Sequence, residues 1–155
     1  MIIKLIISLV IPLLIGFLGS LATQSSISSW YVTLNKPLLN PPSWVFAPVW
    51  SLLYIMIGIN LYLLWQKFLA KKIDKKTFQL FIIQIVLNGL WSPIFFGLKS
   101  PFFSLIIILS LLITLIMIAK QLYQKHKLNF YLLLPYIAWV SFASYLNLGI
   151  FILNL

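Results

Sequence analysis

Five continuous apolar runs cover most of this chain, at about residues 2–23, 43–66, 77–98, 101–122 and 129–153. Each run is close to the ~20 residues that a helix needs to cross a hydrocarbon core of ~30 Å. The runs are continuous and do not alternate, and a backbone exposed to lipid has to satisfy its own hydrogen bonds, so we expect helices. The sequence therefore predicts an all-α integral membrane protein. Its five transmembrane helices form one bundle and one domain over residues 1–155, with a long ordered loop between helices 1 and 2.

The composition agrees with a surface that faces lipid. Only 8% of the residues are charged, whereas a soluble domain carries about 25%. The net charge of +10 does not indicate a nucleic-acid partner, because all eleven basic residues are lysines and most lie in two short clusters between apolar runs. The chain has no cysteine, which excludes disulfides and thiolate metal sites.

The lysines predict how the chain is oriented in the membrane. If the runs alternate in direction, one side collects Lys4, Lys67, Lys71, Lys72, Lys75, Lys76, Lys120, Lys125 and Lys127, and the other side has only Lys36 and Lys99. Because lysine is enriched on the cytoplasmic side, the N-terminus is expected in the cytoplasm and the C-terminus outside. We expect a bacterial cell membrane, with the loop between the first two runs on its outer side.

Ionisable groups are missing from the middle of the predicted spans. The only acid, Asp74, and the only histidine, His126, both lie in lysine-rich loops. Proton pumps and ion-coupled carriers usually place such groups at membrane depth. Acid–base catalysis by a carboxylate or histidine inside the bundle is excluded for the same reason. A lone histidine also predicts no metal site.

Three of the runs carry one face of aromatic and amide side chains. Residues three, four, seven or eight positions apart share a helix face. The faces contain Phe46, Trp50 and Tyr54, then Gln84, Asn88, Trp91 and Phe95, then Pro135, Trp139, Ala143 and Asn147 with Phe142 and Leu146 alongside. One interpretation is packing between helices, with the amides hydrogen-bonded across them. The other is a flat, aromatic-walled pocket for a small molecule.

The stretch from Trp30 to Trp50 is unusual for a connecting loop, since it contains four prolines and three tryptophans. Proline fixes φ near −65° and removes a backbone donor, so this stretch is expected to be stiff and unable to pair as a sheet. Pro41 and Pro42 directly precede the second run, where proline suits a helix start. Such a loop can lie over a cavity at low entropic cost. For Trp44, anchoring at the membrane interface is the alternative.

Three motifs in this chain resemble the TspO/translocator-protein family, also called tryptophan-rich sensory proteins or peripheral-type benzodiazepine receptors. The first is WYxxLxKPxxxPPxxxFxxxWxxLY, matched by Trp30, Tyr31, Leu34, Lys36, Pro37, Pro41, Pro42, Phe46, Trp50 and Tyr54. The second is NxxWSxxFF, matched by Asn88, Trp91, Ser92, Phe95 and Phe96. The third is PYxxWxxFAxxLN, matched by Pro135, Tyr136, Trp139, Phe142, Ala143, Leu146 and Asn147.

The resemblance implies a receptor or translocator that binds porphyrins such as haem, and related flat hydrophobic ligands, in a cavity between the helices. The first loop would cover that cavity as a lid. Binding would serve sensing, transport or clearance, with no covalent cofactor. The implied ligand-binding residues are Trp30, Tyr31, Lys36, Phe46, Trp50, Tyr54, Asn88, Trp91, Phe95, Trp139, Phe142, Ala143, Leu146 and Asn147.

Individual roles also follow from the resemblance. Trp50 and Trp139 would wall the cavity, Asn88 would offer an amide, and Ala143 would leave room for the ligand. From its place in the lid, Lys36 is expected to pair with a porphyrin propionate; the alternatives are a solvated loop charge or a lysine that binds carbonyls of its own loop. Two alternatives to a binding role stay open. One is an enzyme that degrades porphyrin in light, with Trp50, Trp139 or Tyr31 as candidate catalytic residues; the other is a structural membrane subunit without a ligand.

The partners implied are porphyrin-type molecules, the lipid bilayer and a second copy of the chain. Small-residue strips, which let helices approach closely, are candidate contacts either for that homodimer or within one bundle. They comprise Gly89, Pro93 and Gly97 on the third run and Gly16, Gly19 and Ser20 on the first. Sterol binding of the animal type is not expected, because the end of the fifth run, LNLGIFILNL, lacks the tyrosine and the basic residue of the cholesterol motif.

Overall fold

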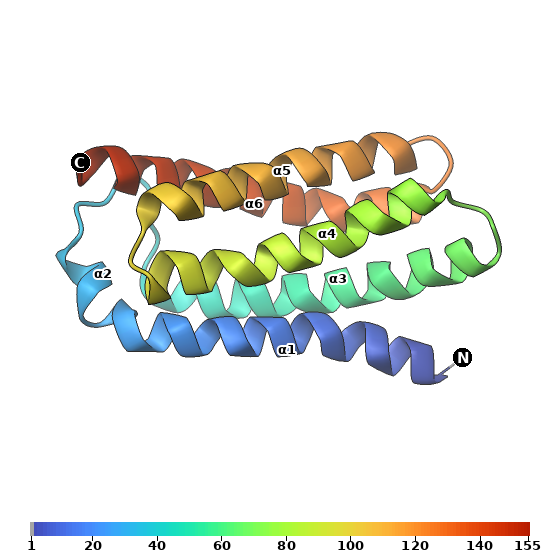
Figure 1. The fold of residues 1–155 in the computed structure, drawn as a ribbon, viewed down its shortest axis with the longest axis horizontal. Coiled ribbons are helices and arrows are strands. Elements are labelled where there is room, and N and C mark those ends of the chain that lie inside the picture. The colour runs from blue at the N-terminus through green and yellow to red at the C-terminus, as the bar shows by residue number, and fades with distance from the viewer. Residues whose placement is uncertain (1) are drawn as a thin grey trace.

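The computed structural model describes residues 2–155, and the described chain is helical with no strands. Its long helices are α1 (Ile2–Ile27), α3 (Phe46–Leu69), α4 (Lys75–Ser92), α5 (Pro101–Leu122) and α6 (Lys127–Leu153). They lie side by side and alternate in direction, as Figure 1 shows. Together with the short turns that extend them, all five are long and apolar enough to cross a membrane. The predicted fold class, a five-span helical bundle with an ordered first loop, is confirmed.

Polar residues extend some helices beyond the predicted apolar runs, so the observed helix bounds differ from the predicted ones. The apolar pattern places the start of the third span at residue 77, but α4 begins at Lys75 because Asp74 caps it. The Asp74 carboxylate accepts a hydrogen bond from the Thr77 backbone N–H at 2.7 Å. Such a cap satisfies one of the free donors at a helix start. Hydropathy does not detect this, since the cap itself is charged.

The first loop contains two short elements that the sequence did not predict, α2 (Trp30–Thr33) and the 3-10 turn η1 (Ser43–Val45). We call residues 30–45 the lid. It leaves the end of α1 and crosses the end of the bundle that also holds the C-terminus (Figure 1). The lid is thus an ordered layer over one end of the helices.

The third span ends in a π-helical turn, η2 (Pro93–Gly97), instead of a regular helix. Proline has no N–H and its ring clashes with the carbonyl four residues earlier, so α-helical bonding is interrupted here. The chain widens, and the Leu98 N–H donates to the Pro93 carbonyl at 2.9 Å. Within this wide turn two consecutive residues, Phe95 and Phe96, are both buried. They form part of the surface on which the lid lies.

Glycines allow α1 to lie directly against α3 and α4. A Cβ on Gly16 would stand 2.2 Å from the Tyr54 ring, and one on Gly58 would stand 2.8 Å from the Ser8 carbonyl oxygen. A Cβ on Gly89 would lie 2.9 Å from Ile15. Glycine residues of both predicted small-residue strips thus contact neighbours of their own chain. This favours their role inside one bundle, and the homodimer stays a prediction.

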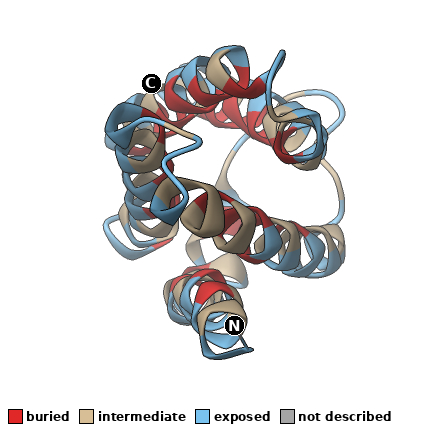
Figure 2. Cartoon of the chain, turned by 90° about the vertical axis from the view of Figure 1, so that its right-hand side faces the viewer, coloured by how far each residue is buried: buried red, intermediate tan, exposed pale blue. Residues whose placement is uncertain are grey.

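The core lies between α3, α4, α5 and α6, and α1 stands at the edge. Fully buried core side chains come from these four helices and include Leu64, Phe81, Leu115, Ile118, Leu133 and Val140. In the end-on view of Figure 2, α1 lies below the other helices, and few of its residues are buried. Its contacts are with α3 and with the α4–η2 span. The apolar outer face of α1 is therefore available to lipid.

Gly58 gives a test of the close approach between α1 and α3. Gly58→Ala places a methyl group against the backbone of Ser8 and Leu9, at 2.8 and 2.9 Å. Backbone cannot yield as a side chain does, so we expect a loss of about 1–3 kcal/mol in unfolding free energy, as for an overpacked core. Thermal unfolding in detergent micelles measures it. The matched control is Gly97→Ala, whose Cβ would lie 3.9 Å from Ala22. Equal melting of both variants would contradict the close approach.

Asp74 gives a test of the α4 cap through pH, because it is the only acidic side chain in the sequence. Hydrogen bonds from the Thr77 hydroxyl and backbone N–H hold the pKa of its carboxyl below the usual value. The folded pKa thus lies below the unfolded value of about 3.9. The cap is fully stabilising above that value and is lost as pH falls through the folded pKa. We expect acidification below about pH 4 to cost up to about 1 kcal/mol of unfolding free energy. Asp74→Asn, a cap that does not titrate, should remove this acid dependence; its persistence would locate the effect elsewhere.

Candidate functional site

A chain of hydrogen bonds between side chains joins three helices at the centre of the bundle. The Tyr54 hydroxyl of α3 donates to the Asn88 side-chain oxygen of α4 at 3.1 Å. The Asn88 side-chain nitrogen donates to the Tyr136 hydroxyl of α6 at 2.7 Å, and that hydroxyl donates to the Gln84 side-chain oxygen at 3.1 Å. Asn88, Tyr136 and Gln84 are buried. We call these four residues the polar network.

Tyr136 is a residue that the sequence did not assign to the site. It belongs to the third motif but lies next to Pro135, outside the four-residue series that contains Trp139. Its hydroxyl is shared by both amides of α4, so it occupies the centre of the polar network. The signal that could have found it is the pair Gln84 and Asn88, because two buried amides one turn apart need a partner from another helix.

Aromatic side chains of α3 and α6 lie against this network. Trp50 stacks on Tyr54 with ring centroids 5.5 Å apart, and the Trp50 and Tyr136 rings meet nearly at a right angle with centroids 6.3 Å apart. Nearer the lid, Phe46 meets Trp139 at 6.0 Å, and Trp139 meets Phe142 at 5.7 Å in the same helix. The predicted aromatic faces of α3 and α6 therefore face each other.

A second group of predicted site residues lies under the lid. Trp30 and Tyr31 of α2 contact Phe95 at ring distances of 5.5 and 6.2 Å, and Trp91 stacks on Phe95 at 5.3 Å. The Trp91 indole N–H donates to the Asn147 side-chain oxygen at 3.0 Å. The Asn147 amide in turn donates to the Pro101 carbonyl at 2.8 Å. Trp91 and Asn147 thus tie α4, α5 and α6 together.

The remaining predicted residues of α6 lie in the packed interior. Ala143 and Leu146 are both 5% exposed, and Ala143 is part of the main apolar core. The structure therefore brings together two groups. The inner group is Phe46, Trp50, Tyr54, Asn88, Trp139 and Phe142, and the outer group is Trp30, Tyr31, Trp91 and Phe95.

The Lys36 ammonium group binds to residues of its own loop. Its ammonium group donates to the Leu34 carbonyl at 3.1 Å and lies 4.9 Å from the centre of the Tyr31 ring. The Tyr31 hydroxyl donates to the Asn40 side-chain oxygen at 3.0 Å. Burial raises the pKa of the Tyr31 phenol, and this hydrogen bond opposes the rise. Lys36 and Tyr31 therefore help to fix the fold of the lid, and binding to a carbonyl of its own loop is one of the roles expected for Lys36.

The lid is fastened to the end of α6. Asn154 accepts from the Asn35 backbone N–H at 3.0 Å and donates to the Asn35 carbonyl at 2.9 Å, so one side chain pairs with both backbone groups. The Tyr145 hydroxyl donates to the Leu38 carbonyl at 2.8 Å. Pro37 of the lid packs directly on Gly149 of α6. A Cβ on Gly149 would stand 2.6 Å from the Pro37 ring.

Two buried donors in and beside the inner group have no acceptor among the described residues, the Trp139 indole nitrogen and the Gln84 side-chain nitrogen. An unpaired buried donor costs about 1–3 kcal/mol. A crevice beside the polar network, bounded by Pro12, Ile57, Ile85 and Gln84 among others, has a volume of about 0 Å³ for a water-sized molecule. A ligand between the aromatic faces of α3 and α6 would have to separate Phe46 from Trp139, whose ring centroids are 6.0 Å apart.

Comparison with known proteins places this architecture. The family model described as the TspO/MBR family matches residues 8–153. A protein named "Tryptophan-rich protein TspO" from Archaeoglobus fulgidus is 42% identical over 153 residues, which are 99% of this chain and 98% of that protein. A protein of the same name from Chlorobaculum tepidum is 42% identical over 92% of this chain and 90% of its own length. The "Translocator protein" of Bos taurus is 36% identical over 88% of this chain and 82% of its own length.

The fastening of the lid can be tested at Asn154. Asn154→Ala removes both hydrogen bonds to the Asn35 backbone, each worth about 0.5–1.5 kcal/mol. We therefore expect amide hydrogen exchange in residues 34–42 to accelerate about tenfold. Mass spectrometry of the exchanged protein in detergent measures it. The matched control is Leu155→Ala, because Leu155 is 88% exposed. Unchanged exchange in Asn154→Ala would mean that Tyr145 and the Pro37–Gly149 contact hold the lid without it.

Proposed function

Because this chain belongs to the TspO/MBR family, we propose that it binds tetrapyrroles such as porphyrin and haem, and related flat hydrophobic ligands, between its helices. The chain is a multi-pass membrane protein of the receptor or translocator type. Binding would serve the sensing, transport or clearance of these molecules. The site would be the inner group, and the lid would cover its outer end.

The observation that carries the proposal is the unpaired indole N–H of Trp139. This donor is buried, and no described residue accepts from it. The Trp139 ring contacts the rings of Phe46 and Phe142, with centroid distances of 6.0 and 5.7 Å. A flat ligand with a carbonyl, carboxylate or ring acceptor would satisfy the donor and offer its faces to the surrounding rings. Small-molecule sites combine apolar walls with a few such polar groups.

Binding would require a local rearrangement of the inner group. The ligand would enter between the aromatic faces of α3 and α6, separating Phe46 from Trp139. Trp50, already stacked on Tyr54, would supply one wall. Asn88 would limit the depth of entry, since both ends of its amide are held by Tyr54 and Tyr136. Ala143 would leave space where a larger residue would fill it.

Lys36 would take part only if it leaves its present partners. Its bond to the Leu34 carbonyl and its position over Tyr31 are internal to the lid. In the proposed complex its ammonium group would turn to a ligand carboxylate at the outer end of the site. The aromatic pairs that hold the lid down, Trp30 and Tyr31 on Phe95, would stay in place.

The orientation and assembly belong to the same proposal. The end of the bundle with the N-terminus and the α3–α4 and α5–α6 loops (Figure 1) carries nine of the eleven lysines. The positive-inside rule would place this end in the cytoplasm. The C-terminus and the lid would then be on the outer side of a bacterial cell membrane. A homodimer completes the proposal.

Trp139→Phe tests the ligand site. The variant keeps an aromatic ring but removes the indole donor, so we expect porphyrin affinity to fall about tenfold. Protoporphyrin IX is titrated into the full chain in nanodiscs, in the dark, and quenching of tryptophan fluorescence is followed. The matched control is Trp65→Phe, since Trp65 lies near the other end of α3 with Lys4 at 5.7 Å from its ring centre. Its affinity should not change.

Other outcomes of this titration decide between the alternatives. Binding that is not saturable in the unmodified chain would support a structural subunit without a ligand. Equal losses in both tryptophan variants would refute the proposed site. Loss of the porphyrin spectrum only under illumination, abolished in Trp139→Phe, would instead support photochemical degradation. Lys36→Gln should weaken protoporphyrin binding more than binding of an uncharged isoquinoline carboxamide; equal losses would assign Lys36 to the lid alone.

A further inference from the structure

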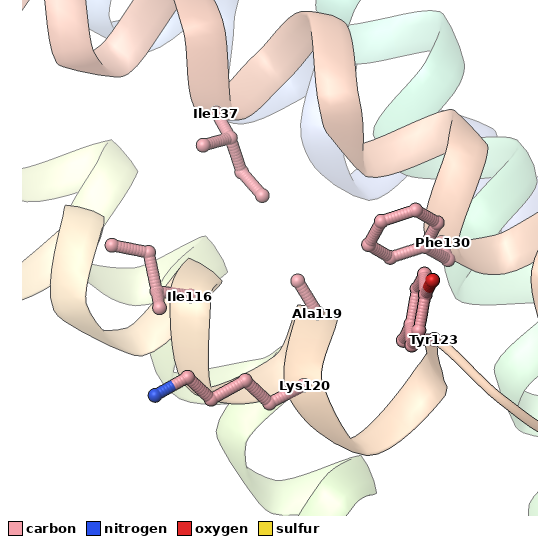
Figure 3. A pocket seen from close by; sticks show the side chains of 6 residues that line it. All are labelled: Ile116, Ala119, Lys120, Tyr123, Phe130 and Ile137. Atoms are coloured by element: carbon pink, nitrogen blue, oxygen red, sulfur yellow. The ribbon is translucent and has the colours of Figure 1, made fainter.

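A groove on the outside of the bundle lies between α5 and α6, far from the lid. It has a volume of about 260 Å³, and Figure 3 shows the six side chains that line it. Three come from α5, one directly follows it and two come from α6: Ile116, Ala119, Lys120, then Tyr123, then Phe130 and Ile137. The groove is close to the α5–α6 loop, and thus to the lysine-rich end of the bundle (Figure 1). It shares no residue with the site proposed above.

The groove exists because a small residue separates larger ones. Ala119 provides only a methyl group, while Ile116 and Ile137 stand on one side of it and Tyr123 and Phe130 on the other (Figure 3). The rings of Tyr123 and Phe130 meet nearly edge-on, with centroids 5.1 Å apart. The result is a mainly apolar groove of about 260 Å³ on the outside of the bundle.

The mouth of the groove is polar and positively charged. Lys120 and Tyr123 are both exposed. Within residues 2–155 neither side chain makes a hydrogen bond or ion pair. The same end of the bundle carries eight further lysines, at positions 4, 67, 71, 72, 75, 76, 125 and 127, against a single acid. That acid, Asp74, is already bound to Thr77. The chain itself therefore does not neutralise this surface.

We propose that this groove binds one anionic phospholipid from the leaflet at the lysine-rich end. An acyl chain lies over Ala119, between Ile116 and Ile137. The phosphate of the headgroup pairs with the Lys120 ammonium and accepts from the Tyr123 hydroxyl. Basic pockets between transmembrane helices on the cytoplasmic side suit anionic headgroups. In Figure 3 the Lys120 side chain extends on the Ile116 side, away from the Tyr123 hydroxyl, so its flexible stem turns toward the headgroup when the lipid binds.

A sterol is the alternative occupant, since Lys120, Tyr123 and Leu128 fit the weak sequence pattern proposed for sterol contact. A sterol presents one neutral hydroxyl and gains little from the surrounding positive charge. A phosphate gains from Lys120 and from the field of the other lysines. The charge of this end of the bundle therefore favours the anionic lipid.

Native mass spectrometry of the full chain in detergent tests the proposal. The protein is titrated with dioleoylphosphatidylglycerol or with dioleoylphosphatidylcholine, which has the same chains but no net charge. We expect one phosphatidylglycerol to be retained at least fivefold more strongly than phosphatidylcholine. Lys120→Gln should reduce this preference about fivefold, the effect of one lysine near a membrane surface. Equal retention of the two lipids would overturn the proposal.

Two further variants separate this groove from the general charge of the surface. Lys75→Gln removes the same charge from the same end, on α4 and away from the groove, and should reduce the preference for phosphatidylglycerol much less than Lys120→Gln does. Ala119→Leu fills the groove and should reduce retention of both lipids, with thermal unfolding confirming that the variant is folded. Equal effects of Lys75→Gln and Lys120→Gln would show diffuse attraction instead of a site. Displacement of phosphatidylglycerol by cholesterol at equal concentration would assign the groove to sterol.

Discussion

The hydrogen bonds of Tyr136 with Asn88 and Gln84 connect α4 to α6 at the centre of the membrane. Hydrocarbon offers no partner for a polar group, so each amide at this depth has to find one within the bundle. Tyr54 adds α3 to the same network through Asn88. The positions of three helices are therefore set by one continuous set of donors and acceptors, around which the apolar residues pack.

The same rule acts at other depths. Asn60 and Asn129 pair through their side chains at 2.6 Å, and Asn60 also donates to the Asn129 carbonyl at 3.0 Å, joining α3 to α6 near the lysine-rich end. Lys67 donates to the Asn129 side chain as well. Near the lid, Trp91 and Asn147 connect α4 and α6. Three polar contacts at three levels thus fix α6 relative to its neighbours. Among the described residues the buried side-chain exceptions are Ser8, Gln84 and Trp139, and they are informative because almost every other buried polar side chain has a partner.

The sequence predicts the parts of this fold that depend on local pattern. The five spans follow from hydropathy, and the face with Asn88 and Trp91 follows from helical spacing. Contacts between distant residues do not follow from pattern. Asn35 and Asn154 are 119 positions apart, and nothing in either segment indicates its partner. The sequence predicts only part of the π-helical turn at Pro93. A proline indicates that the regular helix is interrupted, but only the contact of Phe95 and Phe96 with the lid explains why both side chains are buried. For Lys36 the charge alone predicts an anionic partner, whereas in the folded lid its ammonium group donates to the Leu34 carbonyl.

The fastening of the lid by Asn154 has a consequence for the order in which the protein is made. Residues 30–45 are synthesised early, directly after the first span, but their partner is near the end of α6. The Asn35 backbone has no Asn154 to pair with until α6 has been made, because Asn154 directly follows that helix. The first span and the lid must therefore wait, during synthesis, for the last of the five spans before this pairing can form.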